Sequence, residues 1–378
     1  MRAYKFRLYP TKTQRNHMGK HLVLAKDLWN ELLAHNKRTY TDFGKFSTKN
    51  TLITMTKQYG LFSQTQQEIA GRIDKSIRRF LKLKKQGKEC GFPRFKSIDR
   101  MKSLNYPQAG FRLKGKKLYA NPFGKINIRK HREIDGKIKT LSLKRMPTGK
   151  WFAVFAVEQS EKEPRKNNGQ KVGIDLGLRT LATTSDGIKI ENPRHLKNKE
   201  TELAFIQRKF SRKIRRSKNW KKHKIKVAKI HEKITDTRND FHHKLSRQLV
   251  EKYSLIALEK LNSKNMAEQN YGKHIHDAGW ASLTNMLCYK AEEAGCKIIF
   301  VNPHNTTKTC NKCGKLQDME LADRTYWCKE CGMVEDRDIN AAKNILAKAT
   351  AGMAESNAFG DAEETASMNK EAHDFSRG

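Results

Sequence analysis

The spacing of apolar and polar residues predicts a first region built from one strand, a set of helices and a run of further strands. Residues 2–9 alternate between polar and apolar side chains, which predicts a β-strand. Over residues 11–83 apolar residues recur at three- and four-residue spacing, which predicts helices. Short apolar runs broken by Gly, Pro or Asn fill residues 95–160 and predict strands. Because an isolated strand is not stable, we expect the first strand to join this β region, with the helices inserted between them.

A polar linker precedes a second region of mixed strands and helices. "KVGIDLG" predicts a buried strand, and "TLATTSDGIKI" predicts two strands that turn at Asp186 and Gly187. One or two long helices are expected over residues 200–250. The strand "LIALEKLN", the helix "LTNMLCYKAEEAG", the strand "KIIFV" and the short helix "DINAAKNILAKA" follow. From residue 351 the chain is rich in Ala, Glu, Ser and Asn, which predicts a disordered tail.

The charge of the chain points to a polyanionic partner. Among 378 residues there are 78 Lys and Arg against 39 Asp and Glu, a formal net charge of +39. Such a charge repels itself unless a polyanion neutralises it, so we expect nucleic acid to bind, with an affinity that falls steeply as salt rises. The alternative is a basic surface that only keeps the protein soluble, but twice as many basic as acidic residues exceeds that need.

No apolar run reaches about 18 residues, so we expect no membrane span and no membrane partner. The first ten residues are charged throughout and do not resemble a secretory signal. Four of the seven cysteines form Cys-x-x-Cys pairs and the others show no pairing pattern, which favours a reducing compartment. We therefore expect a cytoplasmic protein, associated with the nucleoid when it is bound to DNA.

Two helical segments carry basic residues in patterns that favour nucleic-acid contact. In the first, Ile69, Ile73 and Ile77 form an apolar stripe beside a basic face, with Gln residues that suit adenine edges at its start. In the second, residues 208–229 hold 12 Lys and Arg and no acid, as in a helix that lies along a phosphate backbone. In both, a solvated face is the alternative. The candidate contact residues are Gln64, Gln67, Arg72, Lys75, Arg78, Arg79, Lys82, Arg212, Arg215, Arg216 and Lys221.

Four cysteines near the end of the chain have the spacing of a zinc site. The pairs Cys310/Cys313 and Cys328/Cys331 are 14 residues apart, and each is followed by a glycine that suits a tight turn. Four thiolates bind one Zn²⁺ tetrahedrally and leave no open position, so we expect a structural site. A redox pair is the alternative, but two matched pairs are redundant for that purpose.

Three acids lie where predicted strands and helices begin or end. Asp175 follows an apolar run, Glu259 ends the strand "LIALE", and Asp338 opens the last helix. Each has a plainer interpretation, such as a helix N-cap for Asp338 or a surface acid for Glu259. Their order along strands, hairpin and helices nevertheless matches a ribonuclease-H-like sheet, whose acids meet at one edge and hold two Mg²⁺ for phosphodiester hydrolysis. Asp336 is the alternative to Asp338.

Several segments together resemble the TnpB family of RNA-guided nucleases, which bacterial insertion sequences encode and which are related to type V CRISPR effectors. These segments are "GIDLGLRTLAT", "LIALEKLN", "TCNKCG", "WCKECG" and "DRDINAAKNIL", supported by "GFPRFK", "YPQ" and "AGWASLTNMLCYKAEEAG". The likeness spans about residues 1–350. One departure is "TTK" at residues 306–308, where a "TSQ"-like stretch is commoner; Lys308 keeps a polar group there, and we expect no loss of activity.

The resemblance implies a mixed α/β multidomain fold. It contains a RuvC-like (ribonuclease-H-like) nuclease domain with an inserted four-cysteine zinc ribbon. An N-terminal β-barrel wedge domain with a helical recognition insert precedes it. The implied boundaries are 1–10 and 95–165 for the wedge domain, 11–94 for the helical insert, 170–302 and 333–350 for the nuclease domain, 303–332 for the zinc-ribbon target-strand module, and 351–378 for the tail.

The resemblance also implies an activity: metal-dependent cleavage of double-stranded DNA beside a short adjacent motif, directed by a guide RNA from the transposon end. It implies one protein chain per ribonucleoprotein, two Mg²⁺ held by the triad Asp175, Glu259 and Asp338, and one structural Zn²⁺. All three acids are present, which argues against the nuclease-dead relatives. Two alternatives stay open: a non-cutting RNA-guided DNA-binding repressor, and a transposase-type strand transferase.

Overall fold

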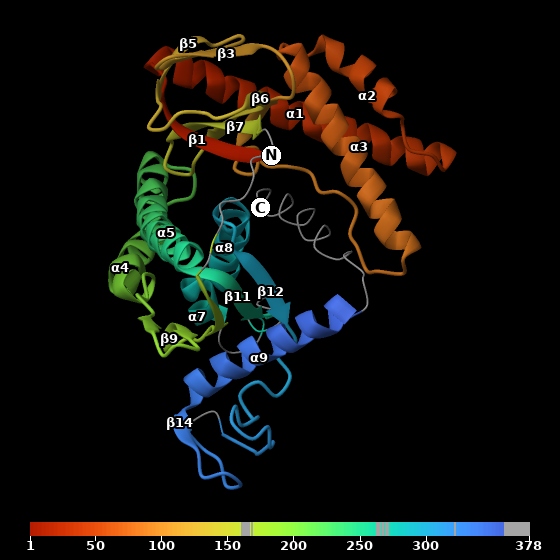
Figure 1. Cartoon of the computed structure of the whole chain (residues 1–378). Coiled ribbons are helices and arrows are strands. Elements are labelled where there is room, and N and C mark those ends of the chain that lie inside the picture. The colour runs from red at the N-terminus through yellow and green to blue at the C-terminus, as the bar shows by residue number, and fades with distance from the viewer. Residues whose placement is uncertain are drawn as a thin grey trace. The chain divides into compact units, whose positions relative to one another are not determined.

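The chain folds into two units, Met1–Glu161 and Lys162–Gly378, each with its own core. Figure 1 shows the computed structural model. The structure describes residues 1–159, 167, 169–261, 266, 268, 272–320 and 323–358. Most of the tail predicted from residue 351, and parts of the two inter-strand segments near 160 and 265, lie outside the described residues.

The first unit contains a seven-stranded antiparallel sheet with the order β2-β6-β7-β1-β5-β4-β3. The first strand of the chain pairs with β7 on one side and β5 on the other, so its predicted union with the later β region is confirmed. The strands are β1 (Arg2–Tyr9), β2 (Ser103–Tyr106), β3 (Phe111–Lys114), β4 (Lys117–Ala120), β5 (Gly124–Arg129), β6 (Lys137–Arg145) and β7 (Trp151–Glu158).

Three helices are inserted between the first two strands of this sheet: α1 (Lys12–Phe43), α2 (Lys49–Met55) and α3 (Ser63–Lys85). A capping box starts α1, since the Thr11 hydroxyl accepts from the Gln14 amide and the Gln14 side chain accepts from the Thr11 amide. The stripe predicted for α3 is buried at Ile69, Ile73 and Ile77. Helices and sheet share one continuous hydrophobic core.

The second unit is built on a five-stranded sheet with the order β10-β9-β8-β11-β12. The strand β9 is antiparallel to both β8 and β10, whereas β11 lies parallel to both β8 and β12. The chain therefore runs through a hairpin on one side of β8 and returns to the other side for its parallel strands. The bounds are β8 (Gln170–Asp175), β9 (Thr180–Thr184), β10 (Lys189–Glu191), β11 (Tyr253–Glu259) and β12 (Lys297–Val301).

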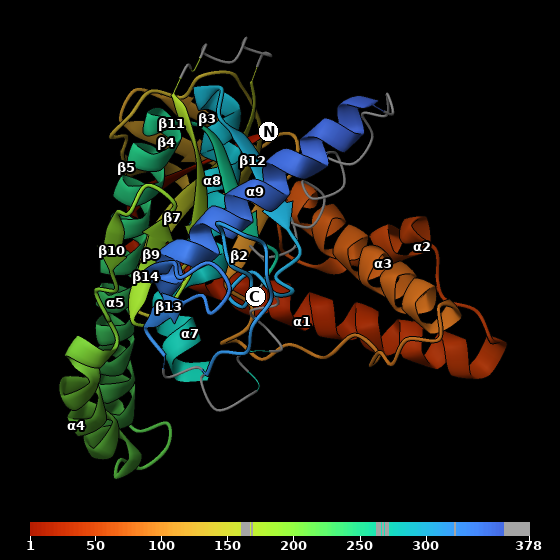
Figure 2. The ribbon, with the colours of Figure 1, turned by 60° about the horizontal axis from the view of Figure 1, so that its bottom comes forward.

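The two faces of this sheet are covered by different helices. The larger core contains Val172, Ile174, Ile256 and Leu258 together with apolar residues of α5, α7 and α8. The opposite face, with Leu255 and Ala257, packs against α9, which crosses the strands in Figure 2. The helices are α4 (Glu200–Ser211), α5 (Lys218–Lys252), α7 (Gly272–Ala278), α8 (Trp280–Ala294) and α9 (Arg337–Ala358).

Two predictions about helices need comment. The basic segment forms two helices, α4 and α5, separated by a turn, and Gly295 ends α8 in the left-handed conformation, as predicted. The last helix is longer than predicted: α9 continues to Ala358, into the segment where the tail was expected to begin. The segment "AGMAESNA" contains no Pro and is rich in Ala, so the helix can continue through it. Among the described helices, none is long and apolar enough to cross a membrane.

Candidate carboxylate and metal sites

Strand register places Asp175 and Glu259 side by side. Asp175 ends β8 and Glu259 ends β11, and the two strands are parallel, with Ile174 opposite Leu258. The next residue of each strand is therefore the acid, at the same edge of the sheet. Because side chains alternate between faces, Asp175 lies on the face of Gly173 and Glu259 on that of Ala257, which is the face that α9 covers.

The third acid reaches the same edge through the close packing of α9 on β8. A Cβ atom on Gly173 would lie 2.0 Å from the carbonyl oxygen of Ala342, so only glycine permits this approach. Asp338 lies four residues before Ala342, or about 6 Å along the helix. Asp175 lies two residues after Gly173, or about 6.6 Å along the strand. The charge of Asp338 acts on Asp175, so these two steps lead from the contact toward the same place.

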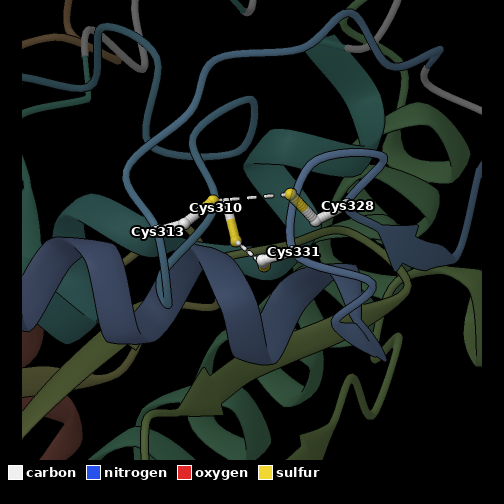
Figure 3. A group of neighbouring side chains, drawn as sticks. All are labelled: Cys310, Cys313, Cys328 and Cys331. Atoms are coloured by element: carbon white, nitrogen blue, oxygen red, sulfur yellow. Dashed lines mark hydrogen bonds between the residues drawn. The ribbon is translucent and has the colours of Figure 1, made fainter.

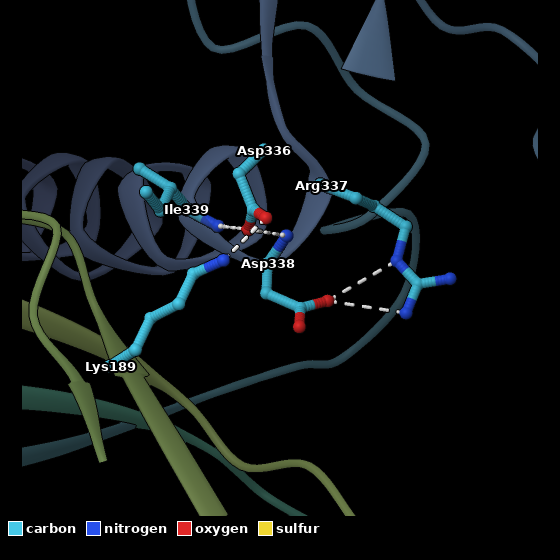
Figure 4. A network of polar contacts seen from close by, with 5 residues as sticks. All are labelled: Lys189, Asp336, Arg337, Asp338 and Ile339. Atoms are coloured by element: carbon cyan, nitrogen blue, oxygen red, sulfur yellow. Dashed lines mark hydrogen bonds and ion pairs between the residues drawn. The ribbon is translucent and has the colours of Figure 1, made fainter. Parts of the chain in front are cut away.

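The two acids at the start of α9 have different roles in the structure (Figure 4). Asp336 is the helix cap: its Oδ1 accepts from the amides of Asp338 (3.0 Å) and Ile339 (3.2 Å), and its Oδ2 pairs with Lys189 (2.5 Å). Asp338 lies in the first turn, and its carboxylate accepts from Arg337 at 3.2 and 3.3 Å. The capping role considered for Asp338 therefore belongs to Asp336, and the Asp338 carboxylate pairs with Arg337 instead.

The charges of Glu259 and Asp338 both act on Asp175. Burial, together with the like charges of Glu259 and Asp338, raises the pKa of Asp175 to about 7, while Arg337 opposes the shift. Burial also raises the pKa of Glu259. The Thr306 hydroxyl, which donates to Glu259, and the charge of Lys348 both lower it. A buried group of like charges is costly without a cation, and oxygen ligands of this kind suit Mg²⁺.

The carboxylate oxygens of Asp175, Glu259 and Asp338 do not form one tight cluster. Within the described part of the chain, only the cysteines form a group of three or more His, Cys, Asp or Glu whose donor atoms all lie within 4.8 Å of one another. Mutual repulsion accounts for this, because Asp338 turns to Arg337 and Glu259 to Thr306. The donor set fits a hydrated hard cation, which keeps several waters and needs few protein ligands.

The four cysteines form a compact sulfur cluster (Figure 3). The Sγ atoms of Cys310 and Cys331 are 3.7 Å apart, and those of Cys313 and Cys328 are 3.5 Å apart. Tetrahedral Zn²⁺ with Zn–S bonds of about 2.3 Å requires sulfur separations of about 3.8 Å, so the arrangement fits zinc. The predicted turns are confirmed: Gly314 and Gly332 have φ of 75° and 69°, and their amides donate to the carbonyls of Cys310 and Cys328.

The cysteine cluster is bonded directly to α9. Asn340 donates to the Thr309 carbonyl (2.9 Å), and its Oδ1 accepts from the amide of Asn311 (2.9 Å). Asn344 donates to the carbonyls of Thr306 (2.9 Å) and Thr309 (2.6 Å). Both asparagines are buried. The segment on either side of Cys310 is therefore fixed to the helix that carries Asp338.

The candidate nucleic-acid residues of α3 fall into two groups. Exposed residues are Gln67, Lys75, Arg78, Arg79 and Lys82. Arg72 is instead half-buried, pairs with Glu68 at 3.0 Å and lies over the Trp29 ring at 5.7 Å. Gln64 is also half-buried, and its Oε1 is enclosed. Arg72 lies three residues after the buried Ile69, or about one helical turn. Direct contact with a ligand is harder for Arg72 and Gln64 than for the exposed group.

The basic segment of the second unit presents its charge to solvent. The end of α4 and the start of α5 are joined by a turn that the rings of Phe210 and Trp220 close, with centroids 5.2 Å apart. Ser217 caps α5, since its hydroxyl accepts from the Trp220 amide at 3.0 Å. The candidate residues here, all exposed, are Arg212, Arg215, Arg216 and Lys221.

Three residues near the carboxylates were not predicted from the sequence. Arg337 bonds Asp338, Thr306 donates to Glu259, and the charge of Lys348 acts on Glu259. The first two stand inside motifs that the sequence singles out, "DRDINAA" and "TTK". Lys348 lies beyond any motif, and its position depends on the direction in which α9 crosses the sheet.

Known families and structures match this architecture. Three family descriptions match parts of the chain: "Probable transposase" over residues 154–270, "Cas12f1-like, TNB domain" over 280–345, and "Helix-turn-helix domain" over 1–45. The last range contains β1 and α1. The chain also resembles a Cas12f1 protein solved in a complex with sgRNA and target DNA, with a TM-score of 0.59 at 16% identity over 89% of this chain and 83% of that one. The fold is therefore the mixed α/β fold of the Cas12f proteins.

Sequence relatives make the assignment more specific. A Streptomyces pristinaespiralis protein, named "Putative RNA-guided DNA endonuclease", is 31% identical over 93% of this chain and 90% of its own length. The Escherichia coli (strain K12) protein "Putative RNA-guided DNA endonuclease InsQ" is 27% identical over 92% of both chains. A mimivirus "TnpB-like protein L79" is 29% identical over 55% of this chain and 43% of its own. The chain belongs to the TnpB family, as its motifs predict.

Proposed function

We propose that the protein is an RNA-guided endonuclease that cuts double-stranded DNA. In this proposal one chain binds one guide RNA derived from the end of its insertion sequence and requires a short DNA motif beside the target. Membership of the TnpB family and the names of the full-length relatives support it. The cutting activity is proposed because the paired parallel strands β8 and β11 end at Asp175 and Glu259, and because the charge of Asp338, in the turn that Asp336 caps, acts on Asp175.

The proposal assigns a task to each part of the chain. The strand order of the second unit supports a RuvC-like nuclease domain over 170–302 and 333–350, interrupted by a zinc-ribbon target-strand module over 303–332. The seven-stranded sheet supports a wedge-like β domain, in barrel form, over 1–10 and 95–165. The helices over 11–94 would be the recognition insert, which reads the adjacent DNA motif, while base pairing with the guide reads the rest.

The three acids would hold two Mg²⁺ at the sheet edge. When bound, such ions activate a water and stabilise the leaving oxygen of a phosphodiester. The chain itself positions the ligands: the parallel strands fix Asp175 and Glu259, and the Asp336 cap fixes the first turn that carries Asp338. Arg337 neutralises Asp338 and so lowers the repulsion among the acids. The four thiolates would hold one structural Zn²⁺.

The test is reconstitution with the RNA that copurifies with the protein. That RNA should be one defined species, and with a matching plasmid library of randomised flanks it should direct cleavage to sites with a shared adjacent motif. Asp175→Ala, Glu259→Ala and Asp338→Ala should each abolish cutting while RNA binding stays near normal. Cutting that needs no RNA would indicate a generic metal-dependent nuclease. Guide-directed binding without any cutting would indicate a repressor.

A further inference from the structure

Thr306 connects the cysteine cluster with the carboxylates. It lies between the end of β12 and Cys310, and its side chain is 2% exposed. Its hydroxyl is within bonding distance of both the Glu259 carboxylate and the Pro303 carbonyl, the latter at 3.0 Å. A hydroxyl has one proton to donate, and a charged acceptor forms the stronger bond. Thr306 therefore holds one oxygen of Glu259.

The carbonyl of the same residue is bound from the other side. Asn344 donates to it at 2.9 Å and also to the Thr309 carbonyl at 2.6 Å. Asn340 then bridges Thr309 and Asn311, the two neighbours of Cys310. One continuous set of buried and half-buried hydrogen bonds thus runs from the segment around Cys310, through α9, to Glu259.

We propose that Thr306 is a positioning residue for Glu259, and that the four-cysteine cluster controls the geometry of the carboxylate site through the 306–311 segment. The four-cysteine cluster cannot hold its own shape without a metal, because its apolar contacts form only a small core around Cys310, Tyr326 and Cys328. Zinc binding fixes it. Loss of zinc releases Thr306 and leaves Glu259 without its partner. This inference rests on the proposed metal-holding role of the three acids.

The experiment measures Mn²⁺ binding by the EPR signal of the free ion, in full-length protein with its guide RNA. Asp175→Ala supplies the baseline, since RNA and surface sites bind Mn²⁺ in that variant too. Thr306→Val removes the hydroxyl and keeps the shape, Thr306→Ser restores it, and Cys310→Ser removes a zinc ligand. Lys308→Gln is the matched control: it lies in the same segment, but its ion pair is with the exposed Asp318. Zinc per chain is measured for every variant.

Loss of a residue that orients a metal ligand typically weakens metal binding about 10–100-fold. We expect that loss in Thr306→Val with the zinc content unchanged, recovery to within about threefold in Thr306→Ser, and no change in Lys308→Gln. Cys310→Ser should lose zinc and Mn²⁺ affinity together. Unchanged Mn²⁺ affinity in Thr306→Val overturns the positioning role. Loss of zinc in Thr306→Val also overturns it, since the residue would then only support the knuckle.

Hydrogen–deuterium exchange gives a readout that needs no metal at the acids. In Cys310→Ser, exchange should rise together in residues 302–311 and in the first turns of α9. A rise confined to residues 310–332, or full Mn²⁺ affinity in zinc-free protein, overturns the coupling. If Asp175→Ala binds as much Mn²⁺ as the unaltered protein, the proposed metal site fails instead, and the exchange pattern alone decides whether the two parts are coupled.

Discussion

Gly173 of β8 lies against the carbonyl oxygen of Ala342 in α9, closer than any other residue type allows. A Cβ atom there would lie 2.0 Å from that oxygen, 2.8 Å from the Leu346 amide nitrogen and 3.0 Å from the Leu346 Cβ. Two of these three atoms belong to the backbone, so no side chain can turn away to relieve the overlap. The glycine in the "VGID" motif therefore sets how close α9 comes to the strand that ends in Asp175.

Gly173→Ala should move α9 away from the sheet and separate Asp338 from Asp175. We expect a loss of about 1–3 kcal/mol in the free energy of unfolding, as for other overpacked cores. Cleavage should fall further than this loss explains, because reacting groups misplaced by about 1 Å can cost about a hundredfold in rate. Denaturant unfolding and guide-directed cleavage, measured on the same preparation, check both effects.

Gly19→Ala is the matched control for this substitution. Gly19 lies within α1, and no atom comes within 4 Å of an added Cβ. Replacing a helical glycine with alanine stabilises by about 1 kcal/mol. The control should therefore raise stability and leave cleavage unchanged. Equal behaviour of the two variants would show that the contact between Gly173 and Ala342 does not position the site.

Asp336 and Asp338 should respond differently to the same change. Asp336→Asn keeps a capping oxygen but loses its charge opposite Lys189, so we expect cleavage within about tenfold of the unaltered protein. Asp338→Asn removes a proposed metal ligand and should abolish cleavage without lowering stability, because its charge repels Asp175. Cleavage rates and thermal unfolding of the pair separate the roles. The reverse pattern would make Asp336 the ligand.

The raised pKa of Asp175 predicts how stability changes with pH in Mg²⁺-free protein. Its pKa is about 7 in the folded chain, against about 4 when unfolded. Between these values the folded state binds more protons, so the free energy of unfolding falls as pH rises toward 7 and levels off above it. Asp175→Asn removes this dependence and should be the more stable protein at pH 8.

We expect a gain of about 1–4 kcal/mol at pH 8 because the raised pKa of Asp175 no longer costs stability, and a smaller gain at pH 5.5. The comparison stays above pH 5.5 because thiolates release zinc when they are protonated. Adding Mg²⁺ should stabilise the unaltered protein and not the variant. A variant that is less stable than the unaltered protein at pH 8 would contradict the burial and repulsion assigned to Asp175.

The sequence predicts the strands that carry the acids because the signal is local. An acid at the end of a continuous apolar run, as at Asp175 and Glu259, marks both the strand and its end. The two Cys-x-x-Cys pairs are equally local, since each closes around one glycine turn. Where the chemistry and the backbone geometry of a site depend on only a few neighbouring residues, composition and spacing are enough to predict that site.

Features that depend on the crossing of distant segments were not predictable in the same way. The choice between Asp336 and Asp338 depends on which carboxylate meets the free amides of α9. The partner of Glu259 comes from a loop 47 residues away, and Arg72 faces inward because Glu68 and Trp29 lie beside it. Periodicity places such residues on an element but does not say which neighbour the element meets.

The two groups on α3 lead to a prediction about the recognition insert. Arg78 and Arg79 are exposed, and Arg78 pairs across one helical turn with Asp74, at 2.9 Å. A pair with so exposed an arginine adds little stability, so Arg78 can turn to a nucleic acid at small cost. Arg72 is held inside the bundle by Glu68 and Trp29.

Charge reversal at Arg78 and Arg79 should weaken DNA binding more than RNA binding. DNA affinity should also fall less steeply as salt rises, and the thermal unfolding temperature should stay the same. Arg72→Glu should instead destabilise the first unit, because it places a second acid beside the half-buried Glu68. Binding titrations at several salt concentrations, with thermal unfolding of each variant, distinguish the two outcomes. If Arg72→Glu lowers DNA affinity without lowering stability, Arg72 contacts the DNA after all. If reversing the charges of Arg78 and Arg79 leaves the salt dependence of DNA binding unchanged, the exposed face of α3 is only solvated.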